Sequence, residues 1–194
     1  MKARTFAAVG MFSALAVILS YFDFMTPFFP AFLKLDFADL PALLIAFAVG
    51  PKAGVLVQLI RNLIHLLITT TGGIGELSNF LIGGTFVAVA GYLYNKNHTK
   101  KGAILSLILA SILMTTIAVL ANYFILLPFY AAFIPMDKII AMANALIPQV
   151  NDMFTFLLFV TVPFNILKAT MISILAFLLY KRLHPIINKI KNEK

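Results

Sequence analysis

Long uncharged apolar runs, separated by short polar segments, dominate the chain. Thr5–Phe22 and Leu77–Tyr94 each cover 18 residues without a charge, and Lys168 is the only charge in Met153–Tyr180. A membrane-spanning helix needs about 20 predominantly apolar residues. The pattern therefore predicts six membrane-spanning helices, approximately at residues 4–22, 36–50, 52–70, 76–95, 102–127 and 153–180.

The weaker runs carry turn signals or polar residues. The second run is short, ends at Gly50-Pro51, and is expected to form a tilted or partly re-entrant span. Arg61, Asn62 and His65 interrupt the third, where they share a helical face. In the fifth, Pro128 is predicted to mark the end of the helix.

Composition supports a membrane protein. Hydrophobic residues make up 62% of the 194 residues and charged residues 11%, with a mean hydropathy of +1.01. Soluble domains have about 45–50% apolar and about 25% charged residues. The runs are apolar on every face, which excludes a β-barrel. We therefore expect an all-α integral membrane protein, with residues 1–194 forming one transmembrane domain.

The placement of charge predicts the topology. With six spans, eleven of the fifteen lysine and arginine residues fall on the side of the termini. Positive charge is retained in the cytoplasm, so both termini are expected to be cytoplasmic in a multi-pass protein of the cell membrane. The net charge of +8 then reflects topology, and a nucleic-acid interface is not expected.

The sequence contains few residues that could form a catalytic site. The chain has no cysteine and only three histidines, and Gly72-Gly73-Ile74-Gly75 lacks the Lys-Ser/Thr of a phosphate-binding loop. Asp36-x-x-Asp39 resembles part of a magnesium-diphosphate motif, but no second acidic cluster accompanies it. We expect neither an enzyme, nor a metal site, nor a cofactor.

Polar residues inside the apolar runs are the candidate binding groups. Asn165 and Lys168 have i, i+3 spacing and share a helical face, and a lysine at this depth is expected to face a cavity. Asn122 is the only amide in the fifth run, where it serves either a ligand or a helix contact. Arg61 and His65 are expected to pair with Glu76 or Asp36.

The first run carries small residues at intervals of three and four positions. This small-residue stripe consists of Ala3, Ala7, Gly10 and Ala14. Small residues let a second helix approach closely in a membrane. Spacing alone leaves open whether that helix belongs to a partner or to this chain.

Several segments together resemble a known family, the riboflavin-specific S components of energy-coupling factor (ECF) transporters. The similar segments are FADLP at 37–41, GPKAG at 50–54, RNLIHL at 61–66, TGGIGELSNF at 71–80, Asn122-Tyr123 with Pro128, and PFNILK at 163–168. The resemblance covers essentially the whole chain. Its most specific parts are residues 72–80 and the Asn165-x-x-Lys168 pair.

The resemblance implies a six-helix protein that captures riboflavin outside the cell. It implies docking on a transmembrane coupling subunit with two cytoplasmic ATPases, and the small-residue stripe would be the docking face. Riboflavin is then the transported substrate and not a cofactor. The implied flavin-ring ligands are Asn122, Asn165 and Lys168, and Leu40, Glu76, Asn79 and Tyr123 complete the candidate substrate-binding set.

The chemistry of a flavin agrees with these residues. Its pyrimidine edge offers carbonyl, N–H and carbonyl in sequence, and the primary amide of Asn165 can pair with it bidentately. Two alternatives stay open. One is an S component for another vitamin, although a carboxylated vitamin would need more cations than one lysine. The other is an integral-membrane lipid-modifying enzyme, which would need clustered acids or histidines at one membrane face.

Overall fold

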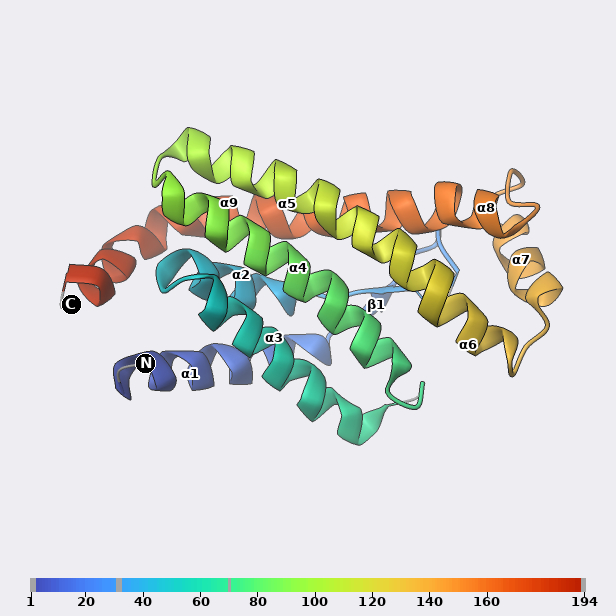
Figure 1. The fold of residues 1–194 in the computed structure, drawn as a ribbon, viewed down its shortest axis with the longest axis horizontal. Coiled ribbons are helices and arrows are strands. Elements are labelled where there is room, and N and C mark those ends of the chain that lie inside the picture. The colour runs from blue at the N-terminus through green and yellow to red at the C-terminus, as the bar shows by residue number, and fades with distance from the viewer. Residues whose placement is uncertain (1–2, 31–32, 70, 193–194) are drawn as a thin grey trace.

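The computed structural model describes residues 3–30, 33–69 and 71–192, and most of them are helical. Figure 1 shows the long helices running lengthwise. A 3-10 turn, η1, follows α3, and two π-helical turns, η2 and η3, interrupt the last two long helices. The elements are α1 (Ala3–Ser20), β1 (Phe24–Met25), β2 (Lys34–Leu35), α2 (Asp39–Ala48), α3 (Pro51–His65), η1 (Leu66–Ile68), α4 (Ile74–Lys96), α5 (Lys100–Ala121), η2 (Asn122–Leu126), α6 (Leu127–Ala131), α7 (Met136–Asn144), α8 (Met153–Phe156), η3 (Leu157–Thr161) and α9 (Val162–Asn192).

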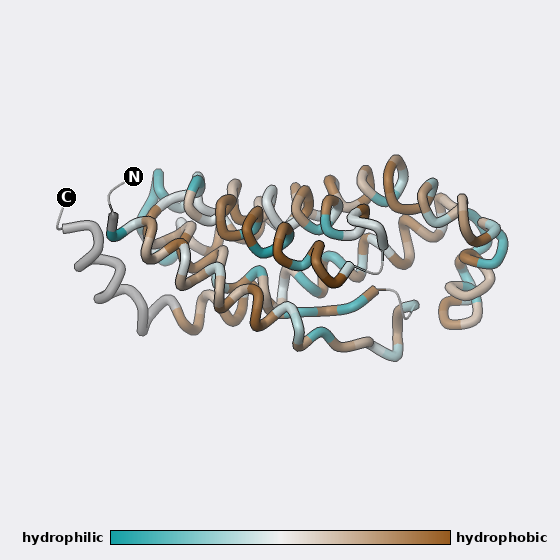
Figure 2. Tube along the Cα trace, turned by 90° about the horizontal axis from the view of Figure 1, so that it is seen from below, coloured by the Kyte–Doolittle hydropathy of each residue, from teal (hydrophilic) through white to brown (hydrophobic). Residues whose placement is uncertain are grey.

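The two ends of the molecule differ in what they contain. The N- and C-termini lie at one end, together with the α2–α3 and α4–α5 turns, whereas α6, α7 and α8 lie at the other (Figure 1). Hydrophobic positions follow the helices between these ends, and hydrophilic positions are frequent near α7 and near the N-terminus (Figure 2). This arrangement suits a bundle that crosses an apolar layer.

In the part of the chain that the structure describes, four helical stretches are long and apolar enough to cross a membrane: Pro51–Ile68, Ile74–Lys96, Lys100–Ala131 and Met153–Leu179. The other two apolar helices, Arg4–Ser20 and Asp39–Ala48, are shorter. Helix α2 has ten residues and a length of about 15 Å, half of the ~30 Å hydrocarbon core. The second expected span, residues 36–50, is therefore a shorter helix than the sequence predicts.

Helix α2 forms the centre of the bundle, because all ten of its residues are buried. It contacts α1, α3, α4 and α9. Two glycines permit this packing: a Cβ at Gly54 would lie 2.6 Å from the Ala46 Cβ, and one at Gly91 would lie 3.0 Å from it. The absence of side chains at these positions lets α3 and α4 approach α2 closely.

The break between the second and third runs is where the sequence predicts it. Helix α2 ends at Ala48, Gly50 adopts a φ of +134°, and Pro51 is the first residue of α3. A residue with a side chain would be strained at this φ, and proline is favoured in the first helical turn.

The predicted end of the fifth helix is wrong. The chain stays helical through Pro128 to Ala131, because η2 precedes the proline. In this turn the Leu127 N–H bonds to the Asn122 carbonyl, an i→i−5 register. The shift in register accommodates a proline that lacks a donor and would clash with the preceding turn of a regular α-helix.

The structure is mostly helical, as expected, and adds two elements that the sequence did not predict. Strands β1 and β2 form a two-residue antiparallel ribbon with Phe24 opposite Leu35, and Lys34 Nζ lies 2.9 Å from Asp23 Oδ2 beside it. The connection before α8 contains the short helix α7, which was not predicted. Two-residue strands give no alternating pattern that a sequence could display.

Candidate functional site

Four oppositely charged side chains meet inside the bundle. This four-charge cluster consists of Asp36, Asp39, Arg61 and Lys168, all buried. Arg61 Nη1 donates to Asp39 Oδ1 at 2.7 Å and Nη2 donates to Asp36 Oδ2 at 3.0 Å. Lys168 Nζ lies 3.1 Å from Asp39 Oδ2. Two carboxylates and two cations cancel formally, which is the condition under which charges persist in a protein interior.

Local sequence explains how α2 and α3 present their part of the cluster. Asp36 and Asp39 lie one turn apart at the start of α2, where the helix dipole favours negative charge. On α3, Gln58 and Arg61 share a face, and Gln58 Nε2 donates to Asp39 Oδ1 at 2.7 Å. A Cβ at Gly83 of α4 would lie 2.9 Å from both Asp39 Oδ1 and Gln58 Nε2. A side chain at this position would therefore displace the Asp39 and Gln58 side chains.

Carboxylates hold the buried ammonium of Lys168 in place, and the cavity expected beside it stays a prediction. Besides Asp39, its ammonium lies 3.6 Å from Asp36 Oδ2 and 3.5 Å from Asn79 Oδ1. Asp39 is the first residue of α2, Asp36 lies three residues before it, and the lysine belongs to α9, so the pairing is created by the fold. Nothing in the local sequence around Lys168 indicates acidic partners.

A chain of amides extends the cluster along α3 and α4. Lys168 Nζ donates to Asn79 Oδ1, Asn79 Nδ2 donates to Asn62 Oδ1 at 3.3 Å, and Asn62 Nδ2 donates to the Gln58 carbonyl at 2.8 Å. The structure thus brings together two candidate binding residues, Asn79 and Lys168, from distant parts of the sequence.

The amide pair, Asn122 and Asn165, lies beside the two π turns. Asn122 begins η2, and Asn165 Nδ2 donates at 2.9 Å to the carbonyl of Thr161, the last residue of η3. Asn122 Nδ2 donates to the Ala118 carbonyl, also at 2.9 Å. Both residues are buried. Each amide keeps one N–H and its oxygen without a partner among the described residues, and π turns often occur at functional sites.

Glu76 is held by the connection between α3 and α4. Its Oε1 lies 2.9 Å from His65 Nδ1, and its Oε2 accepts from the hydroxyls of Thr69 at 2.8 Å and Thr71 at 3.2 Å. The expected pairings of the third helix are thereby confirmed: His65 pairs with Glu76 and Arg61 with Asp36.

The glycine-rich segment before Glu76 is a turn at the start of α4. Gly72 and Gly73 have φ values of +60° and +91°, which a side chain would disfavour. Thr69 Oγ1 accepts from the Gly73 N–H at 3.1 Å, and Thr71 Oγ1 accepts from the Gly75 N–H at 3.0 Å. Threonine side chains and positive φ values together set the direction in which α4 begins.

The two remaining candidate residues, Leu40 and Tyr123, differ from each other in burial. Leu40 is buried in the hydrophobic core directly after Asp39. Tyr123 is half exposed, and its ring packs edge-on against Phe124 at 4.8 Å between centroids. Within the described residues, no hydrogen bond joins Tyr123 to the four-charge cluster. Their roles in ligand binding stay predictions.

The small-residue stripe faces away from the bundle. Ala7, Gly10 and Ala14 are exposed, whereas Val9, Ser13 and Ala16 of the same helix are buried. A Cβ added at Gly10 would meet no atom within 4 Å. The exposed part of the stripe is thus free of internal packing, while the side chain of Ala3 lies outside the described part of the chain.

Metal-ligating side chains do not gather in the described part of the protein, where no group of three or more His, Asp or Glu residues is placed to hold an ion. The polar chemistry consists of the four-charge cluster, the amide chain through Asn79, and the amide pair beside the π turns. Such groups can orient a polar ligand by hydrogen bonding.

Comparison with known proteins identifies the family. The sequence profile of "ECF transporter, substrate-specific component" matches residues 4–180. The chain is 36% identical over 182 residues to the riboflavin transporter RibU of Staphylococcus aureus (strain TCH60), covering 94% of this chain and 91% of the relative. It is 30% identical over 190 residues to the riboflavin transporter FmnP of Bacillus subtilis (strain 168), covering 95% and 94%.

A solved structure, described as the S component of a bacterial ECF transporter, superposes with a TM-score of 0.77 at 34% sequence identity. The match covers 96% of this chain and 99% of the solved one. A profile match over nearly the whole chain, two full-length relatives and a shared fold agree, and the chain belongs to the family of substrate-specific S components of ECF transporters.

Proposed function

We propose that this chain is the riboflavin-binding membrane subunit of an ECF importer, capturing riboflavin outside and delivering it inward. As a substrate-binding component it performs no catalysis. The observation that carries the proposal is the polar face formed by Asn165 and Lys168, with Asn79 at 3.5 Å from the lysine, in a chain whose relatives are named riboflavin transporters.

Asn165 is suited to the pyrimidine edge of the flavin. One of its N–H groups is bonded to the Thr161 carbonyl, which fixes the orientation of the amide. The remaining N–H and the oxygen are one donor and one acceptor, the pair needed to match a neighbouring carbonyl and N–H of the ligand. Asn122 offers the same two groups from the other π turn.

Lys168 can exchange a weak contact for the ligand. Its contacts with Asn79 Oδ1 and Asp36 Oδ2 are long, at 3.5 and 3.6 Å, whereas Asp39 Oδ2 lies at 3.1 Å. A flavin carbonyl can replace the long contacts while Asp39 keeps the ammonium in place. The cluster stays neutral, because riboflavin carries no charge.

The same neutrality disfavours a phosphorylated ligand. Arg61 and Lys168 are already matched by Asp36 and Asp39, and among the side chains that the structure describes no other cation is buried for the phosphate of FMN. Burying an unpaired dianion is costly. We therefore expect riboflavin to bind more tightly than FMN.

A fluorescence titration tests the proposal. Riboflavin should copurify with the protein as a yellow chromophore, and quenching of flavin fluorescence should report one site per chain. The chain contains no tryptophan, so the flavin signal is free of tryptophan emission. Equal affinities for riboflavin and FMN would contradict this site, and absence of flavin binding would refute the function.

The membrane arrangement belongs to the same proposal. The protein is a multi-pass membrane protein, and we place six helices across the membrane with both termini cytoplasmic. The excess of lysine at the end that holds the termini supports this orientation. Since the chain has no cysteine, single cysteines at Asn97 and Lys138 can be labelled selectively. An impermeant reagent should reach only the second from outside; labelling of the first instead would reverse the orientation.

The small-residue stripe is the proposed docking face for the coupling subunit, which would carry two ATPases. Gly10→Leu should block close helix approach and abolish transport into vesicles. Riboflavin binding by the isolated subunit should be retained, because Gly10 touches nothing else in the bundle. Met11→Phe, at an exposed position off the stripe, is the matched control. Normal transport by Gly10→Leu would exclude the stripe from docking.

A further inference from the structure

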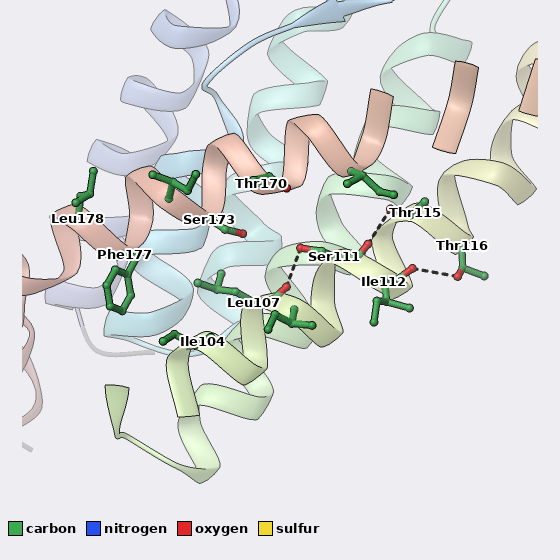
Figure 3. A pocket seen from close by; sticks show the side chains of 13 residues that line it. Ile104, Leu107, Ser111, Ile112, Thr115, Thr116, Thr170, Ser173, Phe177 and Leu178 are labelled. Carbon is green, nitrogen blue, oxygen red and sulfur yellow. Dashed lines mark hydrogen bonds between the residues drawn. The ribbon is translucent and has the colours of Figure 1, made fainter. Parts of the chain in front are cut away.

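A large apolar groove lies between α5 and α9, apart from the proposed riboflavin site. Its volume is about 680 Å³, within the range of about 300–1,000 Å³ typical of small-molecule pockets. Figure 3 shows its side chains converging from the two helices. The lining residues are Ile104, Leu107, Ile108, Ser111, Ile112, Thr115, Thr116, Ile166, Thr170, Ser173, Ile174, Phe177 and Leu178.

The chemistry of the lining does not suit a polar solute. It contains no charged or amide side chain. Of its five hydroxyls, three donate to carbonyls of their own helix, Ser111 to Leu107 at 2.7 Å, Thr115 to Ser111 at 2.9 Å and Thr116 to Ile112 at 3.0 Å (Figure 3). The other two belong to Thr170 and Ser173, and among the described residues the buried Ser173 Oγ has no hydrogen-bond partner. Most of the lining is nevertheless aliphatic or aromatic. The groove is therefore suited to a flexible apolar chain.

Two lysines continue the groove at the start of α5. Ile104 lies four residues after Lys100 and three after Lys101, so both lysines share the helical face that lines the groove. Both are exposed. Lysine side chains can extend along apolar surface and place the ammonium at the membrane–water boundary. The groove thus has a positively charged entrance and an apolar interior.

The length of the groove matches one membrane leaflet. From Ile104 to Thr116 the α5 axis advances about 18 Å, and half of the ~30 Å hydrocarbon core is about 15 Å. A chain anchored at Lys100 and Lys101 would reach the bilayer midplane along these residues.

We propose that the α5–α9 groove is a binding site for an anionic phospholipid. One acyl chain lies along α5 between Ile104 and Thr116, and the phosphate contacts Lys100 and Lys101. Charge complementarity and the match to one leaflet distinguish this occupant from a second protein helix, which would need no basic entrance. The site is independent of riboflavin binding.

Native mass spectrometry of the detergent-purified protein can test this proposal. We expect phosphatidylglycerol to bind about ten- to thirtyfold more tightly than phosphatidylcholine. The double variant Lys100→Gln/Lys101→Gln should bind both lipids equally and weakly. The matched control is Lys52→Gln/Lys138→Gln, which removes two exposed lysines on α3 and α7, helices that do not line the groove; it should keep the preference.

A groove-filling substitution tests the apolar part. Ile112 is 60% exposed, so Ile112→Trp should fold normally and occupy the groove, with loss of bound phosphatidylglycerol. Retained riboflavin binding in each variant shows that the fold is intact. Equal binding of the two lipids by the unmodified protein, or full lipid binding by either groove variant, would overturn the proposal. It would equally be overturned if these variants kept lipid but lost association with the coupling subunit, which would make the groove a protein interface.

Discussion

Lys168→Met removes one of the two cations of the four-charge cluster and leaves two carboxylates facing one guanidinium. The cluster changes from neutral to a formal charge of −1 among side chains that are at most 12% exposed. Breaking a buried ion pair by removing one partner costs about 3–5 kcal/mol. Inserting a lysine into a membrane costs roughly 2.5–3.5 kcal/mol on insertion scales. That cost arises when the single helix enters the membrane, before the helices pack into the bundle. We therefore expect Lys168→Met to destabilise the assembled bundle.

A second substitution separates charge from packing. Asp39→Asn in the same chain restores neutrality, and its side-chain oxygen can still accept from Gln58 and Arg61 as Asp39 Oδ1 does. The double variant should therefore be more stable than Lys168→Met, with a coupling energy of about 1–3 kcal/mol. Loss of packing alone would make the two substitutions additive.

Thermal unfolding in detergent, followed by the helical circular-dichroism signal, measures these effects. At about 2–4 °C per kcal/mol for a chain of this size, Lys168→Met should lower the midpoint by roughly 6–20 °C. Lys138→Met, which removes an exposed lysine on α7, should leave it unchanged. A Lys168→Met protein as stable as the original would refute the reasoning, because the ammonium would then contribute nothing to the cluster.

Three further predictions concern the site and its support. Gly83→Ala should lower the unfolding midpoint by the equivalent of about 1–3 kcal/mol, because its Cβ would lie 2.9 Å from Asp39 Oδ1 and Gln58 Nε2; Gly10→Ala, with open space, is the control and should not lower it. In fluorescence titrations, Asn165→Leu and Lys168→Met should each weaken riboflavin binding by about 1.5–3 kcal/mol, or roughly ten- to a hundredfold, and the double change should cost less than the sum; unchanged affinity in both single variants would remove them from the site. The backbone N–H of Thr155 bonds to Asp152 and holds the pKa of that carboxylate below its ordinary value of 3.8. The Asp152 carboxylate therefore caps α8 fully at a pH above 3.8, and the cap is lost as the pH falls through the lowered pKa. The hydrogen-exchange protection factor at the start of α8, which corrects for the slower intrinsic exchange in acid, should accordingly fall on acidification in the original protein but not in Asp152→Asn, which keeps a capping oxygen at every pH; identical protection profiles would contradict the capping role.

The positions of most long helices could be predicted from the sequence. The uncharged runs and the Gly50-Pro51 break place most helix positions correctly, because lipid requires continuous apolar surface and a local glycine-proline pair ends a helix. The exceptions arise from local geometry. Residues 24–25 and 34–35 are too short to show a strand pattern, and η2 lets Pro128 continue a helix that a proline normally ends.

Individual polar residues of the candidate site could be proposed from the sequence, but the ion pairs and hydrogen bonds that join them could not. Lys168 is recognisable as unusual from its depth in an apolar run, whereas its carboxylate partners, Asp36 and Asp39, lie before and at the start of α2, far away in sequence. Helical spacing groups side chains three or four positions apart, such as Arg61 with His65 and Asn165 with Lys168, but it does not show which residues of other helices they contact. The effect of a side chain at position 83 follows only from the three-dimensional contacts with Asp39 and Gln58.

The distribution of the four-charge cluster over the chain has a consequence for biogenesis. Asp36, Asp39 and Arg61 are synthesised early, whereas Lys168 arrives with the last long helix. Until that helix is in place, the nascent bundle holds two carboxylates and a single cation, so its centre carries an uncompensated negative charge. We therefore expect the helices inserted first to pack loosely until α9 is in place, because Lys168 then neutralises charges that entered the membrane more than a hundred residues earlier.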